Sequence, residues 1–158
     1  MYIVIDPGET VGIAIFSTVL RNRRLHLDLV DAFDVVSETI GDFTYRLYTQ
    51  ELRTHHPSEV VVEDYRIYRG KAEVHTGVRL YTAEMIGAIR GVCALFVPRI
   101  GAIVYPAQTK GAWPLAKLDK YFPRHGEYKG HCHDAIQLGL YHAETALKWD
   151  TSTGVSEV

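Results

Sequence analysis

Apolar and polar residues alternate along this chain with two different periods, which separates strands from helices. Residues 2–5 are all apolar or aromatic and end at Asp6, a run typical of a strand buried on both faces. A turn follows, in which Gly8 and Gly12 allow backbone conformations that are closed to other residues. Apolar residues over 11–16 then predict a hairpin partner, and residues 25–30 alternate as a half-exposed strand does. We therefore expect three antiparallel strands at the start of the chain.

The period changes to that of a helix after this meander. Residues 37–53 carry apolar side chains with helical spacing, and Ser37 is a suitable N-cap. A β-branched run over 59–62 ends at Glu63, and because a helix precedes it we expect this strand to lie parallel to the first one. The later patterns predict a long helix over 76–96, a strand over 102–105, a turn over 106–111, a short helix over 113–122, a loop over 123–129 and a last helix from His131 to about Leu147.

These elements predict an α/β fold with a mixed five-stranded sheet, three strands antiparallel and two parallel, flanked by helices. The length of 158 residues favours one domain, which we expect over residues 1–150. Residues 151–158 are small and polar, and we expect them to be a disordered tail.

The composition says more about the cellular environment of the protein than about its function. No stretch approaches the roughly 18 apolar residues of a membrane span, and the strand-like N-terminus lacks a basic leader, so we expect no membrane partner and no secretory signal. Two distant cysteines favour a reduced, cytoplasmic setting over a disulfide framework. The net charge of −2 argues mildly against a nucleic-acid partner, but binding depends on a local basic face rather than on the total charge.

Two of the predicted strands end in acid at the same edge of the sheet. Parallel neighbours place their carboxyl ends together, so Asp6 and Glu63 should meet there, at the customary ligand edge of open α/β sheets. Two neighbouring carboxylates repel each other unless a cation lies between them. The alternatives are that Asp6 caps its own turn, and that Glu63 and Asp64 form an exposed turn.

The start of the last helix supplies further candidates. His131 and Asp134 are three residues apart and share one face of that helix, near an end whose partial positive charge favours an anion. His133 points elsewhere and is expected at the surface. Cys132 among these histidines, and the pair His55-His56, could indicate a metal site, but neither has the spacing of a zinc motif.

Basic and aromatic residues interleave directly after Glu63. Aromatic rings offer stacking surface and basic side chains contact phosphates, which is the usual combination in nucleic-acid grooves, although a solvated loop would explain the same residues. Lys110 should lie near the acidic edge, and Lys117 should lie on a helix surface. The candidate DNA-binding residues are Tyr65, Arg66, Tyr68, Arg69, Lys71 and Lys117.

Three motifs in this order resemble the RuvC type of Holliday junction resolvase, within the RNase H-like superfamily and most like small phage-encoded members. They are the turn Ile5-Asp6-Pro7-Gly8 with Thr10 and Gly12, the strand end Val60-Val61-Val62-Glu63, and the helix start His131 with Asp134-Ala135. The resemblance spans residues 2–147.

The resemblance implies a two-metal nuclease. Asp6, Glu63, His131 and Asp134 would hold two Mg²⁺ or Mn²⁺ ions, and Lys110 would lie near the scissile phosphate. Most relatives carry Asp where this chain has His131, and a nitrogen ligand favours Mn²⁺ relative to an all-oxygen site. The family carries an aromatic wedge residue shortly after the catalytic Glu. This chain has Arg66 at that spacing, so the wedge has no obvious counterpart.

The implied activity is the resolution of four-way DNA junctions by paired symmetric nicks, in recombination and repair. It implies a homodimer through the helix over 76–96, whose residues Gly87, Gly91 and Ala94 form a small face, and a bacterial host cytoplasm if a phage encodes the chain. Alternatives are a flap, fork or RNA-processing nuclease and a non-catalytic junction-binding module. An actin-like phosphotransferase, suggested by the first turn alone, would need a second domain.

Overall fold

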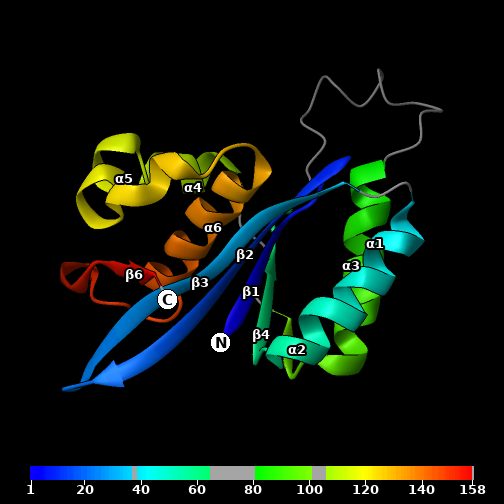
Figure 1. The fold of residues 1–158 in the computed structure, drawn as a ribbon, viewed down its shortest axis with the longest axis horizontal. Helices are drawn as coiled ribbons and strands as arrows, with labels where there is room; N and C mark the ends of the chain where they lie inside the picture. Colours follow the sequence, from blue (N-terminus) through cyan, green and yellow to red (C-terminus); the bar gives the residue numbers. More distant parts are fainter. Residues whose placement is uncertain (37–38, 65–80, 101–105, 158) are drawn as a thin grey trace.

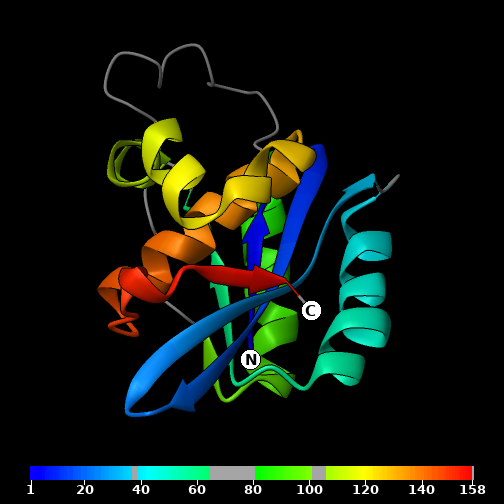
Figure 2. The same ribbon diagram turned by 60° about the vertical axis from the view of Figure 1, so that its left-hand side comes forward.

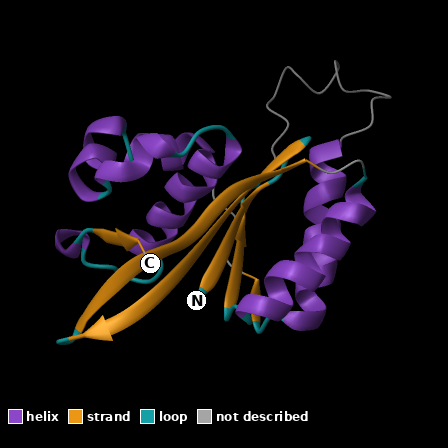
Figure 3. Ribbon diagram, in the orientation of Figure 1, coloured by secondary structure: helices purple, strands orange, loops and turns teal. Residues whose placement is uncertain are grey.

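A twisted sheet runs through the molecule with helices on both of its faces (Figures 1 and 3). The structure is a computed structural model that describes residues 1–36, 39–64, 81–100 and 106–157. Within these ranges the sheet has six strands in the order β5-β4-β1-β2-β3-β6. The mixed α/β class is therefore confirmed, with one strand more than the sequence predicts.

The strands are β1 (Tyr2–Asp6), β2 (Thr10–Arg21), β3 (Arg24–Val36), β4 (Glu59–Val62), β5 (Arg99–Ile100) and β6 (Val155–Glu157). The helices are α1 (Ile40–Arg46), the π-helix η1 (Leu47–Leu52), α2 (Arg53–His55), α3 (Tyr81–Phe96), α4 (Pro106–Ala112), α5 (Leu115–Tyr121), the 3-10 turns η3 (Pro123–Glu127) and η4 (Thr151–Thr153), and α6 (His131–Thr145).

The predicted strand pairings are confirmed at the centre of the sheet. β1, β2 and β3 form the antiparallel meander, with a bulge in β3 at Val30, between the partners of Ile15 and Phe16. β4 lies parallel to β1, with Tyr2 opposite Glu59 and Ile5 opposite Val62. β1 is thus an interior strand with its carboxyl end beside that of β4.

Side chains of β1 enter two different cores, because successive residues of a strand face opposite sides of the sheet. Tyr2 and Val4 pack in the core under α6, and Ile3 and Ile5 pack in the core under α1 and α3. Figure 2 shows α6 lying across one face while α1 and α3 cover the other. Both faces of β1 are buried, as its unbroken apolar run predicts.

Some of the sequence predictions are wrong, and others concern residues outside the described ranges. The loop predicted over 123–129 contains the 3-10 turn η3. Thr39 caps α1 by accepting a 3.1 Å hydrogen bond from the Asp42 backbone, whereas the predicted cap, Ser37, lies outside the described residues. The predicted turn over 106–111 is the helix α4. The strand predicted over 102–105 lies outside the described residues, and so does the start of the helix predicted over 76–96.

Residues 151–157, where the sequence predicts a disordered tail, contain η4 and β6. Trp149 is buried, stacks on Trp113 with ring centroids 5.8 Å apart, and donates through Nε1 to Thr153 Oγ1 at 3.0 Å. This anchor returns the chain to the sheet, where β6 pairs parallel to β3. The predicted tail is small and polar, but the tryptophan that precedes it supplies the apolar contact that holds it. None of the described helices is long and apolar enough to cross a membrane.

Candidate active site

The carboxyl ends of β1 and β4 bring Asp6 and Glu63 together. The Glu63 backbone donates to the Ile5 carbonyl at 2.9 Å, which continues the parallel ladder past Val62. The two carboxyl groups lie close enough to interact, and the hydrogen-bonding capacity and negative charge of Asp6 both raise the pKa of Glu63. A hydrogen bond between two carboxyls needs a proton on one of them, and these interactions favour Glu63 as the group that carries it. The predicted meeting of the two acids is confirmed.

The surroundings of Glu63 favour its protonated form. Burial, the hydrogen bond to Asp6 and the negative charges of Asp6 and Asp134 raise the pKa of Glu63 to about 9, and the nearby Lys110 ammonium only partly opposes them. Asp6 itself is 7% exposed. The acidic groups at this edge of the sheet therefore repel one another, and Lys110 offsets that repulsion only in part.

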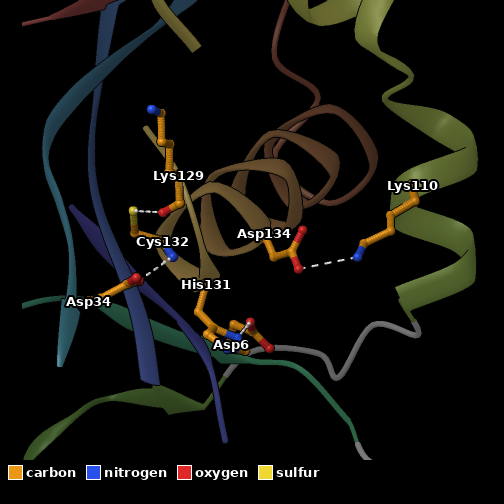
Figure 4. A network of polar contacts seen from close by, with 7 residues as sticks. All are labelled: Asp6, Asp34, Lys110, Lys129, His131, Cys132 and Asp134. Carbon is orange, nitrogen blue, oxygen red and sulfur yellow. Dashed lines mark hydrogen bonds and ion pairs between the residues drawn. The ribbon is translucent and has the colours of Figure 1, made fainter. Parts of the chain in front are cut away.

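The first turn of α6 brings His131 and Asp134 to the same edge. His131 Nδ1 lies 2.8 Å from Asp6 Oδ2, within hydrogen-bonding distance, and Figure 4 shows the two side chains meeting below the helix end. A Cβ on Gly12 would overlap the carbonyl of His131, so β2 must carry a glycine at this point for α6 to approach. Asp134 is one turn further along α6 and points toward α4 (Figure 4).

Lys110 completes the group from α4. Its ammonium donates to Asp134 Oδ2 at 3.2 Å, while most of the lysine side chain is exposed. Lys110 thus lies at the acidic edge, as predicted, although it is carried by a helix instead of the predicted turn. Strands β1 and β4 and helices α4 and α6 together place Asp6, Glu63, Lys110, His131 and Asp134 in one region.

Lys117 is not part of this group. It pairs with Glu144 at 2.7 Å near the far end of α6, and its ammonium lies 4.2 Å from the centre of the Trp113 ring. The rise of 1.5 Å per residue puts Glu144 roughly 20 Å from His131 along the helix. Lys117 as a DNA contact stays a prediction. The other candidates, Tyr65, Arg66, Tyr68, Arg69 and Lys71, lie outside the described residues.

Neither alternative metal site gathers a set of ligands among the described residues. His55 pairs with Glu51 at 3.6 Å, and His56 is the left-handed residue that ends α2. Cys132 is buried, and its thiol donates to the Lys129 carbonyl at 3.0 Å (Figure 4). No group of three or more His, Cys, Asp or Glu side chains has the geometry of a metal site within the described part of the chain.

The four described side chains at the sheet edge also do not form such a group, but their donor atoms are of the kinds that a divalent cation accepts. Three carboxyls and one imidazole are ligands that Mg²⁺ and Mn²⁺ accept. The raised pKa of Glu63 reflects the repulsion between adjacent carboxyls, which a bound divalent cation would also relieve. His131 and Lys110 provide the remaining partners of the acids.

Sequence reasoning missed two features of this site. Gly12 was attributed to backbone freedom, but the described residues with positive φ do not include it, and its role is to leave space for α6. Asp34, on β3, accepts a hydrogen bond from the Cys132 backbone at 2.6 Å (Figure 4). The strand predicted over 25–30 stops before Asp34, and the contact depends on a helix about 100 residues later, so no local pattern predicts it.

A sheet in this order, with a last helix packed across its first three strands, is the fold of the RuvC-type Holliday junction resolvases. RuvC of T. thermophilus, solved in complex with a Holliday junction substrate, is 21% identical with a TM-score of 0.64, covering 97% of this chain and 96% of that one. The fowlpox virus Holliday junction resolvase is 15% identical with a TM-score of 0.61, covering 91% and 97%.

A third similar structure is the yeast mitochondrial Holliday junction resolvase. It is 11% identical with a TM-score of 0.55, covering 90% of this chain and 83% of that one. Neither the models of known protein families nor the curated proteins give a match to this sequence. At these identities the likeness establishes the fold, and the activity has to be argued from the site.

Proposed function

We propose that this chain is a metal-dependent endonuclease that resolves four-way DNA junctions by paired symmetric nicks. The proposal rests on the contact between Asp6 and Glu63. Helix α6 places His131 and Asp134 at the same edge of the sheet. An acidic cluster at the carboxyl edge of parallel strands is a place to hold cations against a phosphodiester. The similar structures support the choice of substrate, since one of them contains a Holliday junction.

Asp6, Glu63, His131 and Asp134 would hold Mg²⁺ or Mn²⁺, two ions in all, with Asp6 central among the ligands. Such ions, when bound, make water more acidic and stabilise the charge that develops on the leaving oxygen. His131 makes one ligand a nitrogen and leaves three carboxylates, so the site carries less negative charge than an all-acid one. That composition favours Mn²⁺ at least as much as Mg²⁺.

The remaining polar groups would position the substrate. Lys110 is exposed and sits beside Asp134, so its ammonium can exchange the carboxylate for a phosphate oxygen without leaving a buried charge unpaired. Tyr65, Arg66, Tyr68, Arg69 and Lys71 would continue the DNA path beyond Glu63, with the rings stacking and the cations on phosphates. The expected products are a 5′-phosphate and a 3′-hydroxyl.

Paired nicks would need two active sites related by two-fold symmetry, and we propose that α3 forms the dimer contact. Gly87 and Gly91 are exposed on α3, and outside their own helix backbone and chain neighbours a Cβ at either would meet nothing within 4 Å. Leu95 and Phe96, at the end of the same helix, are 76% and 50% exposed. A face of small residues beside exposed apolar ones suits close packing against a second copy.

A cleavage panel tests the proposal. End-labelled four-way junctions, flaps, forks, plain duplex and structured RNA are incubated with Mn²⁺ and the wild-type chain, with Asp6→Asn as the inactive comparison. Symmetric nicks on opposite strands of the junction, absent with Asp6→Asn, are expected. Cutting confined to flaps, forks or RNA would replace resolution by a broader nuclease activity. Junction binding without nicking in either metal would identify a binding module instead.

A further inference from the structure

Asp6, Gly12 and Asp34 form a row across the sheet. Gly12 of β2 is the register partner of Asp6 on one side and of Asp34 on the other. Side chains of directly opposed residues point to the same face of a sheet, so both carboxyl groups of the row face the side covered by α6. Asp6 meets His131 on one side of Gly12, and Asp34 meets Cys132 on the other (Figure 4).

The first turn of α6 lacks a cap of its own. Its N-cap residue is Gly130, with φ of 69° and ψ of −147°, a conformation that favours glycine, and it has no side chain to accept a backbone hydrogen bond. Asp34 Oδ1 takes that place by accepting from the Cys132 backbone at 2.6 Å. A Cβ on Gly130 would come within 2.5 Å of Asp34 Oδ2.

We propose that Asp34 is a positioning residue for the active site, which acts through the first turn of α6. Its carboxylate caps the helix from a neighbouring strand and fixes where His131 begins, because Cys132 is the next residue along the chain. Gly12 leaves space for the first turn of α6 to pack against the sheet. Asp34 fixes the position of that turn along the row. The consequence for metal binding and cleavage rests on the proposed function, whereas the capping itself does not.

Amide hydrogen exchange of the metal-free protein tests the capping alone. Asp34→Ala should speed exchange at Cys132 and its neighbours by about fivefold, the factor that corresponds to loss of a typical N-cap. Amides in the second half of α6 should keep their wild-type rates. Asp34→Asn retains an oxygen acceptor and should restore most of the protection. Unchanged exchange at Cys132 in Asp34→Ala would overturn the proposal, as would an equal increase along the whole helix.

Titration with Mn²⁺, followed by calorimetry and by single-turnover junction cleavage, tests the positioning. Asp34→Ala should raise the half-saturating Mn²⁺ concentration by about fivefold, with Asp34→Asn intermediate. Asp31→Ala is the matched control, because Asp31 is an exposed acid of the same strand whose Oδ1 accepts from the next backbone amide, at 2.8 Å. A merely structural residue would lower the folded fraction and leave the half-saturating concentration unchanged, and that outcome would overturn the proposal.

The hydrogen-exchange and Mn²⁺ experiments distinguish failure of the positioning role from failure of the proposed function. If the wild-type chain neither binds Mn²⁺ nor cuts junctions, the nuclease proposal fails, while the exchange rates at Cys132 still decide whether Asp34 caps α6. If the wild type cuts and Asp34→Ala matches it in both exchange and metal dependence, only the positioning role is lost.

Discussion

Asp6 and Glu63 lie side by side at the ends of two parallel strands, close enough for Asp6 to raise the pKa of Glu63. Burial and the neighbouring acids favour Glu63 as the group of this pair that carries a proton. Substituting either acid therefore changes the electrostatic surroundings of the other.

Stability should fall with pH because of Glu63. Its pKa is raised from 4.5 to about 9 in the folded chain, so the folded state binds this proton more tightly than the unfolded state. The resulting stabilisation is complete below pH 4.5 and is lost as the pH rises toward 9. We expect the free energy of unfolding of the metal-free wild type to decline over this window relative to Glu63→Gln. Urea titrations in a chelating buffer measure it, and parallel pH profiles would contradict the prediction.

Gly12→Ala should damage the site more than the fold. The added methyl overlaps the His131 carbonyl, so the start of α6 must move away from Asp6. Gly139→Ala is the matched control, because its methyl meets the Phe16 ring in the middle of the same helix and sheet interface. Both variants should lose about 1–3 kcal/mol of stability. Only Gly12→Ala should also lose most of its Mn²⁺ affinity and nicking, and equal losses in the two variants would refute a local effect.

Lys110→Gln should leave stability almost unchanged and slow cleavage. The ion pair with Asp134 is largely exposed, and such pairs contribute about 0–1 kcal/mol. Loss of a cation aimed at a phosphate oxygen should reduce the single-turnover rate by about a hundredfold. Lys120→Gln, which removes a lysine that lies over the Tyr121 ring on α5, serves as the comparison and should cut at the wild-type rate. Equal rates for Lys110→Gln and wild type would remove Lys110 from the mechanism.

Metal preference should follow His131. With one nitrogen among its ligands, the wild-type site should support cleavage with Mn²⁺ at least as well as with Mg²⁺. His131→Asp restores an all-carboxylate set and should raise the activity in Mg²⁺ relative to that in Mn²⁺. Initial rates across a concentration series of each metal measure the ratio. Wild-type activity in Mg²⁺ alone would show that the imidazole is not a ligand.

Gly91→Leu should weaken self-association without disturbing the monomer. The space around Gly91 is open within one chain, so the leucine side chain finds room there, and replacing an exposed helical glycine adds helix propensity of about 0.8 kcal/mol. In a closely packed dimer the same side chain would separate the two helices. Sedimentation should then show a dissociation constant raised by about tenfold or more. Gly111→Leu, at an exposed and open position of α4, is the control, and an unchanged dimer in Gly91→Leu would exclude this face.

Local patterns were enough to predict the central strands and the acids that end them. The apolar runs before Asp6 and Glu63 depend only on neighbouring residues, and a helix between two strands makes them parallel, so the meeting of the two acids follows from general rules. The helical spacing after His131 likewise predicts that His131 and Asp134 share a face. These features could be found in the sequence because each one repeats over a short stretch.

Tertiary packing alone decided how α6 is placed on the sheet. The sequence does not reveal whether a glycine such as Gly12 is needed for backbone freedom or for space. The close approach of the His131 carbonyl shows that Gly12 is needed for space. Asp34 lies beyond the alternating residues 25–30, and only its hydrogen bond from the Cys132 amide distinguishes it from other polar residues. Trp149 similarly returns the last residues to β3 through its contact with Trp113. Such contacts join residues far apart in the chain, and no periodicity in the sequence records them.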